Sequence, residues 1–219
     1  MPKQRTPAAD NKFYRQIGTH GWRDSDYFTF SAISAPFRRW MAERIEKSKA
    51  DILSIGCGAG ELEIHLATDG HRVVGLDISH HMLKRAMQLG LQRTTEADAR
   101  FLPFEWDCFD LVIFPESIGH VPLDDVFREA RRVLRPGGQV WVTTYSGDLE
   151  THPRYRKYKL ADLASSFDET GFRVAEHRFL NAKRNSIADG LSYEKSTLLY
   201  IAAVKEDAPK PAPGRRGKR

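Results

Sequence analysis

The hydrophobic residues of this chain gather in short runs, each bounded by Gly, Asp or Pro. Four runs are continuous rather than alternating, which is typical of strands in a parallel sheet that is covered on both faces. These predicted strands span residues 52–55, 73–76, 111–114 and 140–144. The pattern therefore predicts a buried, largely parallel sheet.

Amphipathic stretches separate these strands. Between residues 123 and 134, apolar side chains recur at steps of three and four with Arg and Glu between them, which predicts a helix with one apolar face. The sequence Pro136-Gly137-Gly138 is expected to end this helix and turn the chain into the next strand. Residues 61–68 and 80–89 form similar stretches. The alternation predicts a doubly wound, mostly parallel, Rossmann-like α/β sheet whose ligands bind at the carboxyl ends of its strands.

The two ends of the chain have a different character. After a predicted helix at 160–169, the runs 172–180 and 196–204 are expected to pair as a hairpin, which gives the sheet a C-terminal antiparallel strand. The aromatic-rich N-terminal part includes an apparent helix ending in Arg38-Arg39-Trp40-Met41 and is interpreted as a helical lid over the site. The predicted organisation is a flexible N-terminus (1–12), one domain (13–204) made of the lid (13–48) and the core (49–204), and a disordered basic tail (205–219).

The net charge of +5 first suggests a nucleic-acid partner, but its location argues against one. Residues 205–219 hold six Lys or Arg and two Asp or Glu, a net +4, which leaves +1 for the remaining chain. A nearly neutral body lacks the phosphate-binding charge of a strong nucleic-acid binder. Because the chain has neither a long apolar run nor a secretory signal, we expect no membrane span and a cytoplasmic location.

The strongest candidate site follows the first predicted strand, where Gly56, Gly58 and Gly60 alternate with other residues before a helix. Glycines permit positive φ and close approach of a ligand to the backbone. Glu61 stands where a dinucleotide-binding turn would have a further glycine, and its charge would repel phosphates. The spacing therefore favours a ligand without phosphates, although a turn that binds no ligand would have the same glycines.

Two carboxylates follow this turn at the ends of the next strands. Asp77 lies about where nucleotide-binding folds place the acid that accepts hydrogen bonds from the ribose hydroxyls. It would also suit the cap of the helix that starts near His80. Asp98, about 20 residues later, is placed to accept a hydrogen bond from an adenine amino group.

With these residues the chain resembles the class I S-adenosylmethionine (SAM)-dependent methyltransferase superfamily, especially its small-molecule, ubiquinone-biosynthesis-like branch. The resemblance spans residues 51–142 and includes Ile-Gly-Cys-Gly-Ala-Gly60, Gly-Leu-Asp-Ile-Ser79, Ala-Asp-Ala-Arg-Phe-Leu-Pro-Phe104, Phe109-Asp-Leu-Val-Ile-Phe114 and Leu134-Arg-Pro-Gly-Gly138. It implies that SAM is the cofactor, that the glycine turn binds the methionine moiety, and that Asp77 and Asp98 bind ribose and adenine. Ser54 stands where the family often has an acidic residue. The resemblance implies these cofactor-binding residues: Ser54, Gly56, Cys57, Gly58, Gly60, Asp77, Ile78, Asp98, Ala99 and Pro115.

Methyl transfer from a sulfonium is an in-line displacement, so the enzyme mainly orients the acceptor and removes water. Glu116 and His120 lie just past the fourth strand and are the candidate catalytic residues, because either side chain can take a proton from an acceptor. His120 would equally suit a hydrogen bond that fixes the loop. The candidate substrate-contacting or lid residues are Tyr14, Trp22, Tyr27 and Tyr145, and ordinary packing is the alternative for each of them.

Three other groups of residues carry less information. His80 and His81 are adjacent on a predicted helix, where neighbouring side chains diverge by about 100°, so no metal is expected there. With only Cys57 and Cys108, the chain also lacks a four-cysteine zinc site. Residues 152–158 either contact an acidic or phenolic acceptor or form a solvated loop.

The favoured function is transfer of a methyl group from SAM to an O, N or C nucleophile of a small molecule, by a monomer or homodimer. The segment Pro115-Glu116-Ser117-Ile118 differs from the Asn/Asp-Pro-Pro-Tyr/Phe motif of enzymes that methylate base amino groups. An RNA or DNA methyltransferase that uses the basic tail nevertheless stays an alternative. A non-catalytic SAM-binding regulator is a further alternative, and an NAD-linked oxidoreductase is the most distant one.

Overall fold

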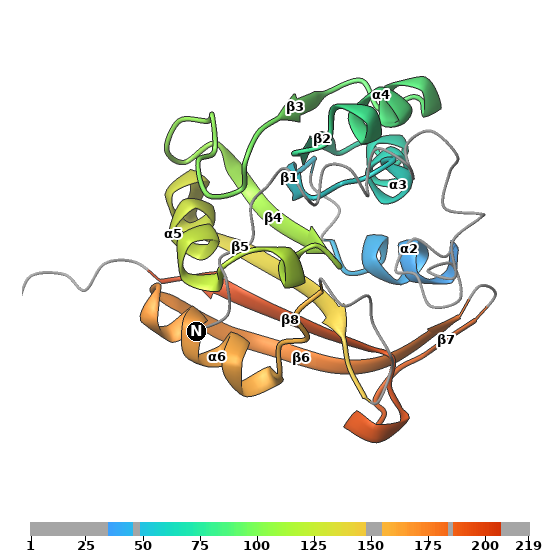
Figure 1. Ribbon diagram of the computed structural model, residues 1–219, viewed down its shortest axis with the longest axis vertical. Coiled ribbons are helices and arrows are strands. Elements are labelled where there is room, and N and C mark those ends of the chain that lie inside the picture. The colour runs from blue at the N-terminus through green and yellow to red at the C-terminus, as the bar shows by residue number, and fades with distance from the viewer. Residues whose placement is uncertain (1–34, 46–48, 148–154, 184–185, 207–219) are drawn as a thin grey trace, which may run out of the picture.

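The computed structural model describes residues 35–45, 49–147, 155–183 and 186–206 of the chain. They form a single eight-stranded sheet with the order β3-β2-β1-β4-β5-β8-β6-β7, with helices on both of its faces (Figure 1). The predicted doubly wound α/β class is confirmed. Among the described residues, no helix is both long and apolar enough to span a membrane.

The first five strands form the parallel half of the sheet. They are β1 (Asp51–Ile55), β2 (Arg72–Asp77), β3 (Thr94–Glu96), β4 (Phe109–Pro115) and β5 (Leu134–Tyr145). β1 pairs in parallel with β2 and β4, β2 with β3, and β4 with β5. The connecting helices are α3 (Glu61–Thr68), α4 (His80–Leu89) and α5 (Leu123–Val133), with the short 3-10 helix η3 (Ile118–His120) after β4.

The remaining strands add an antiparallel edge. After α6 (Leu160–Glu169) come β6 (Phe172–Lys183), β7 (Ser186–Ala188), the 3-10 helix η4 (Tyr193–Lys195) and β8 (Leu198–Lys205). β8 lies between β5 and β6 and runs antiparallel to both. The predicted pairing of the two C-terminal runs is confirmed. The connection between them is more than a loop, because it contains β7, which pairs with β6.

Two boundaries differ from the sequence prediction. Pro136-Gly137-Gly138 does not separate α5 from the next strand, because β5 begins at Leu134 and the three residues lie within it, where the register with β4 shifts. Gly137, with φ of +72°, accommodates this irregularity. Lys205, the first residue of the predicted tail, belongs instead to β8 and pairs with Asp107 at 2.9 Å.

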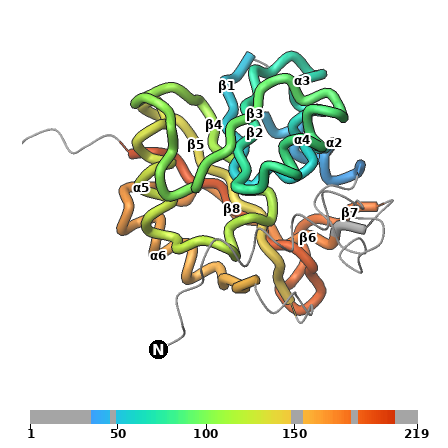
Figure 2. Tube along the Cα trace, turned by 45° about the horizontal axis from the view of Figure 1, so that its top comes forward, coloured from blue at the N-terminus to red at the C-terminus, as the bar shows by residue number. Residues whose placement is uncertain are grey.

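The core has two parts, one on each face of the sheet. One face is covered by α5 and α6, whose Phe127 and Phe167 stack with their ring centroids 4.3 Å apart. The other is covered by α3 and by α2 (Ala35–Ala42), the described part of the N-terminal segment. α2 buries Phe37, Trp40 and Met41 in this second cluster and lies beside β7 (Figure 2). The part of the predicted lid that comes before α2 lies outside the described residues.

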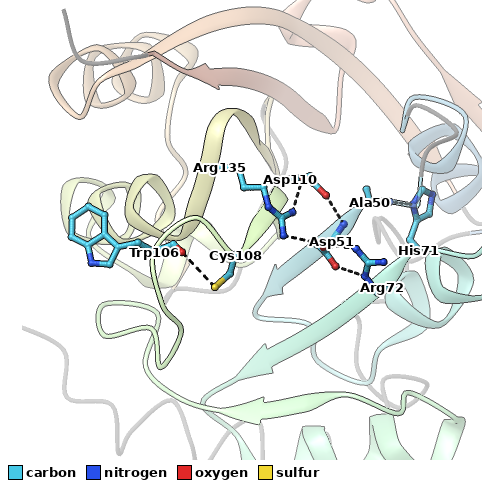
Figure 3. Close-up of polar contacts among 8 residues, drawn as sticks. All are labelled: Ala50, Asp51, His71, Arg72, Trp106, Cys108, Asp110 and Arg135. Atoms are coloured by element: carbon cyan, nitrogen blue, oxygen red, sulfur yellow. Dashed lines mark hydrogen bonds and ion pairs between the residues drawn. The ribbon is translucent and has the colours of Figure 1, made fainter. Parts of the chain in front are cut away.

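A charged network ties the amino ends of the parallel strands together (Figure 3). Asp51 of β1 pairs with Arg72 of β2 at 2.5 Å and with Arg135 of β5 at 2.9 Å. Arg135 also pairs with Asp110 of β4 at 2.7 Å, and the Asp51 N–H donates to the Asp110 carboxylate at 2.8 Å. The network lies at the amino ends of the strands, which leaves the carboxyl ends of the same strands for a ligand.

Candidate functional site

The glycine turn joins β1 to α3 in a conformation that L side chains rarely adopt. Gly56, Gly58 and Gly60 have φ of +76°, +56° and +79°. The N–H groups of Gly56 and Cys57 donate to the carbonyl of Leu76 at 2.7 and 3.0 Å, which holds the turn against the end of β2. A Cβ at Gly56 would lie 2.3 Å from Cβ of Ser117, so the segment after β4 packs directly on the turn.

Asp77 ends β2 and is hydrogen-bonded through both carboxylate oxygens. Oδ2 accepts the Gly58 N–H at 2.9 Å and Oδ1 accepts the Ser79 N–H at 2.8 Å, so the acid binds the glycine turn and also the start of α4. Burial raises the pKa of Asp77, and the backbone hydrogen bonds oppose that rise. Each oxygen keeps acceptor capacity, as a ligand with two vicinal hydroxyls requires. Ser79 Oγ, buried nearby, has no hydrogen-bond partner among the described residues.

Asp98 lies two residues beyond β3 and is bound by Arg100. The guanidinium reaches both carboxylate oxygens, with Nη2 2.6 Å and Nε 3.0 Å away, and the Arg100 N–H adds a bond of 2.9 Å. These contacts, led by the Arg100 side chain, lower the pKa of Asp98. A ligand amino group at Asp98 therefore meets an acid that already has a charged partner. Arg100 was not predicted from the sequence, although it lies only two residues after Asp98.

Ser54 lies next to the glycine turn and is completely buried on β1. Its hydroxyl donates to Oε1 of Glu63, in the first turn of α3, at 2.5 Å. Glu63 is only 1% exposed, and burial, the largest influence, raises its pKa to about 7. Glu63 was not predicted from the sequence, because it lies in a stretch that has the pattern of an ordinary amphipathic helix.

Glu116 follows β4 and has φ of +57°, a conformation that is uncommon for a side chain other than glycine. Its N–H donates to the Thr143 carbonyl at 3.1 Å. The Tyr145 hydroxyl donates to Oε2 of Glu116 at 2.7 Å. Ser117 Oγ donates to the Ile55 carbonyl at 2.5 Å. The segment after β4 is thus anchored on both neighbouring strands, β1 and β5.

His120 and two tyrosines form an aromatic group beside Glu116. The His120 ring packs edge-on against Tyr155 with centroids 5.1 Å apart, and Tyr155 packs against Tyr145 at 4.9 Å. The Tyr155 hydroxyl is 2.9 Å from Thr144 Oγ1. Tyr155 is buried, and so is Tyr158, whose hydroxyl donates to the Val121 carbonyl at 3.0 Å. The solvated-loop interpretation is therefore wrong for both tyrosines.

The sequence-predicted site residues within the described part of the chain lie at or just beyond the carboxyl ends of β1 to β5, except His120, which lies in η3. Cys57 is buried within the turn, where burial raises its pKa. Ile78 follows Asp77, Ala99 is buried beside Asp98, and Pro115 ends β4. Tyr145 joins Glu116 from the end of β5. The predicted lid residues Tyr14, Trp22 and Tyr27 lie outside the described residues.

Residues 53–142 match the protein family described as "Methyltransferase domain". The match contains the glycine turn, Asp77, Asp98 and Glu116 in one continuous segment. The matched segment lies within the parallel part of the sheet, so this part of the chain is similar to the methyltransferase domain.

Among curated proteins, the ubiquinone biosynthesis O-methyltransferase of Pseudomonas putida is 31% identical to this chain over 137 residues. The alignment covers 57% of this chain and 58% of the relative, so the chain spans less than two thirds of the curated relatives' length.

Solved structures agree in fold at low identity. The Burkholderia thailandensis 1,6-didemethyltoxoflavin-N1-methyltransferase, solved with bound 1,6-didemethyltoxoflavin and S-adenosylhomocysteine, aligns with a TM-score of 0.68 at 18% identity. That alignment covers 94% of this chain and 93% of the other. A chain from the Haloferax volcanii complex between the Trm112 methyltransferase activator and a putative methyltransferase aligns with a TM-score of 0.70, also at 18% identity, over 89% of this chain and 98% of the other.

Proposed function

We propose that this protein transfers the methyl group of SAM to an O, N or C nucleophile of a small-molecule acceptor. The observation that carries the proposal is the bond between the Gly58 N–H and the Asp77 carboxylate at 2.9 Å. This bond joins the glycine turn and the acid of β2 into one preformed unit, which would offer the backbone of the turn to one part of SAM and a carboxylate acceptor to the ribose hydroxyls. The residues fit SAM, a nucleoside without phosphates.

The sheet suggests how SAM would lie. β3, β2, β1 and β4 are neighbours in that order, so Asp98, Asp77, the glycine turn and Glu116 follow one another along the carboxyl edge. We assign adenine to Asp98, ribose to Asp77, the methionine moiety to the turn, and the acceptor to the side of Glu116. SAM supplies the electrophilic methyl group. The chain orients it towards the acceptor and excludes water.

Glu116 is the proposed proton acceptor for those substrates that must lose a proton. Its φ of +57° directs the residue away from the path of a regular strand, and its carboxylate is held by Tyr145 at 2.7 Å. Backbone strain of this kind is concentrated at functional sites, where the surrounding structure maintains it. Tyr145 positions the Glu116 carboxylate, and the ring of His120 lies on the same side of the proposed site.

The small-molecule acceptor is supported by the relatives as well as by the charge distribution. The Pseudomonas putida relative is named for ubiquinone biosynthesis, and the Burkholderia thailandensis structure holds 1,6-didemethyltoxoflavin. Residues 1–204 carry a net charge of only +1, which suits a small-molecule acceptor better than a phosphate backbone.

Asp77→Ala tests this proposal directly. The variant should bind SAM more weakly by about 1.5–3 kcal/mol, because the ribose hydroxyls lose a charged acceptor. Isothermal titration calorimetry with SAM measures the loss, and unchanged affinity would place the ribose elsewhere.

In parallel, wild-type protein incubated with labelled SAM and a metabolite extract should release S-adenosylhomocysteine. Binding without any turnover would favour the non-catalytic regulator, and tight NADH binding without SAM affinity would overturn the proposal.

A further inference from the structure

Glu63 is a buried acid beside the proposed cofactor site that the fold alone does not explain. It is 1% exposed, lies in the first turn of α3, and receives the hydroxyl of the fully buried Ser54 at 2.5 Å. Among the described residues it forms no salt bridge. A buried carboxyl without a cationic partner is costly when ionised, so such groups are either neutral or compensated by a charge that arrives later.

The position of the pair relative to the sheet indicates which part of a ligand it would meet. Ser54 lies two residues before Gly56, on the strand between β2 and β4. Asp77 at the end of β2 is assigned to ribose, so the ligand atoms over β1 belong to the methionine moiety. That moiety carries an ammonium group, a full positive charge at neutral pH.

We propose that Glu63, held by Ser54, is the counter-charge for the ammonium group of the SAM methionine moiety. This inference rests on the proposed function. The family that this chain resembles often has an acidic residue at the position of Ser54. Here Ser54 supplies a hydroxyl on the strand, and Glu63 supplies the negative charge from α3. Glu63 is a positioning residue, which holds the amino-acid end of SAM so that the methyl group faces the acceptor.

The charges around Glu63 favour its neutral form before the ligand arrives. Burial raises its pKa to about 7, and Glu61 on the same helix and Asp77 on β2 also act to raise it. Cys57 in the turn faces it with a thiol whose pKa is also raised. α2 packs on α3 through apolar side chains, with Arg38 partly exposed, Arg39 exposed and Arg44 paired with Asp189. On α4, Lys84 and Arg85 are exposed.

An ammonium group beside the Glu63 carboxyl would favour the ionised carboxylate, so binding of SAM would release the proton of Glu63. SAM affinity should therefore rise with pH through the range in which the free protein's Glu63 titrates. From pH 5.5 to pH 7.5, where the ligand's ammonium stays largely charged, the Kd should fall on the order of tenfold, which corresponds to a pKa shift of about one unit or more. S-adenosylhomocysteine should behave in the same way, because it has the same ammonium group. Methylthioadenosine lacks the amino-acid moiety and should bind equally across this range.

Calorimetry on the wild-type protein provides the first test. At about pH 6.5, SAM titrations in two buffers of different ionisation enthalpy should show net proton release, and methylthioadenosine titrations should show none. Equal proton release with both ligands would overturn the assignment. Failure of the wild-type protein to bind SAM, S-adenosylhomocysteine and methylthioadenosine would contradict the proposed function itself, and with it this inference.

Glu63→Gln provides the second test. The variant should lose the pH dependence of SAM binding and keep the wild-type affinity for methylthioadenosine, which also reports that it is folded. Glu61→Gln is the matched control, because it removes a carboxylate two residues away on the same helix and should retain the pH dependence. A pH dependence that persists in Glu63→Gln would overturn the proposal.

Discussion

Glu116 combines an uncommon backbone conformation with a side chain that is already fixed. An L residue at φ of +57° costs about 1–2 kcal/mol, and here the Tyr145 hydroxyl and the Thr143 carbonyl both hold it. A carboxylate placed in this way is ready to accept a proton without rearranging. Its preorganisation is the kind of electrostatic arrangement that contributes most when charge develops during a reaction.

Glu116→Gln should leave SAM affinity within about twofold of the wild type and reduce turnover by about 100-fold or more, the usual contribution of a general base. The amide keeps the shape and cannot take up the proton. Turnover of the identified acceptor and SAM binding by calorimetry give the two measurements. Tyr145→Phe is the companion variant and should show a smaller loss, since it removes only the hydroxyl that positions the carboxylate. Unaltered turnover in Glu116→Gln would remove Glu116 from the mechanism.

The burial of Glu63 should be visible in the stability of the ligand-free protein. A carboxyl whose pKa rises from 4.5 to about 7 on folding favours the folded state when it is protonated. Its contribution is fully present below pH 4.5 and is lost as the pH rises through about 7. The free energy of unfolding of the wild type should therefore fall relative to Glu63→Gln by about 1–3 kcal/mol between pH 4.5 and pH 7.5. Urea denaturation at both pH values measures this difference, and a constant difference would show that Glu63 is ionised throughout.

The pairing of Ser54 with Glu63 could not be predicted from the sequence. The sequence identified Ser54 as a departure from the family pattern, but the residue that accompanies it is nine positions away on a helix. The stretch Glu61-Leu62-Glu63 reads as an alternation of charged and apolar residues at a helix start. Which of its two glutamates is buried depends on how α3 packs on β1, a tertiary property that periodicity does not encode.

At the scale of elements, the glycine turn and the segment after β4 form one packed unit. The Cβ of Ser117 occupies the space that a side chain at Gly56 would need. We therefore expect a change in the glycine turn to move Glu116 as well, because Glu116 is the neighbour of Ser117 along the chain. The proposed cofactor side and the proposed acceptor side of the site meet at this contact.

Gly56→Ala should destabilise the protein by about 2–4 kcal/mol, because the new methyl group clashes with Ser117 and the residue has φ of +76°. Gly70→Ala separates these two causes, since Gly70 has φ of +96° but no atom within 4 Å of the position that a Cβ would take. It should cost only about 1–2 kcal/mol. Urea denaturation of both variants provides the comparison. Equal losses would mean that the backbone conformation, rather than the contact with Ser117, determines the cost.

The elements that the sequence predicted well are those whose identity follows from burial alone. β1, β2 and β4 are continuous apolar runs because helices cover both of their faces, and the bounds of α3, α4 and α6 matched the structure. β3 and β7 are short edge strands with polar residues and gave no such signal. The early start of β5 was missed because Pro136-Gly137-Gly138 has the composition of a turn. Here a register shift against β4 absorbs these residues.

At the scale of the whole molecule, the charge is divided between the folded part and the C-terminal residues. Of the net +5, residues 205–219 carry +4. Lys205 is the last residue of β8 and forms an ion pair with Asp107. A chain that ends after Glu206 therefore keeps every residue of β8. Such a truncation separates the contribution of the basic residues from that of the domain.

The truncated chain should bind SAM with the wild-type Kd and methylate its small-molecule acceptor at the wild-type rate, because the proposed site lies at the opposite end of β8 from the tail. Calorimetry and a turnover assay under low-salt conditions provide the measurements. Lost turnover with intact SAM binding would instead favour a nucleic-acid acceptor that the basic residues bind. A chain that ends at residue 197 serves as the contrasting variant, because it removes β8 itself.

β8 follows every other described strand in the chain, yet it occupies an interior position between β5 and β6. Six of its eight residues are buried, so until they emerge from the ribosome β5 and β6 each expose an unpaired edge. Unpaired edges attract other chains, so we expect the nascent protein to be prone to association until β8 has been synthesised. A chain that stops just before β8 is therefore expected to aggregate, even though it contains the whole glycine turn.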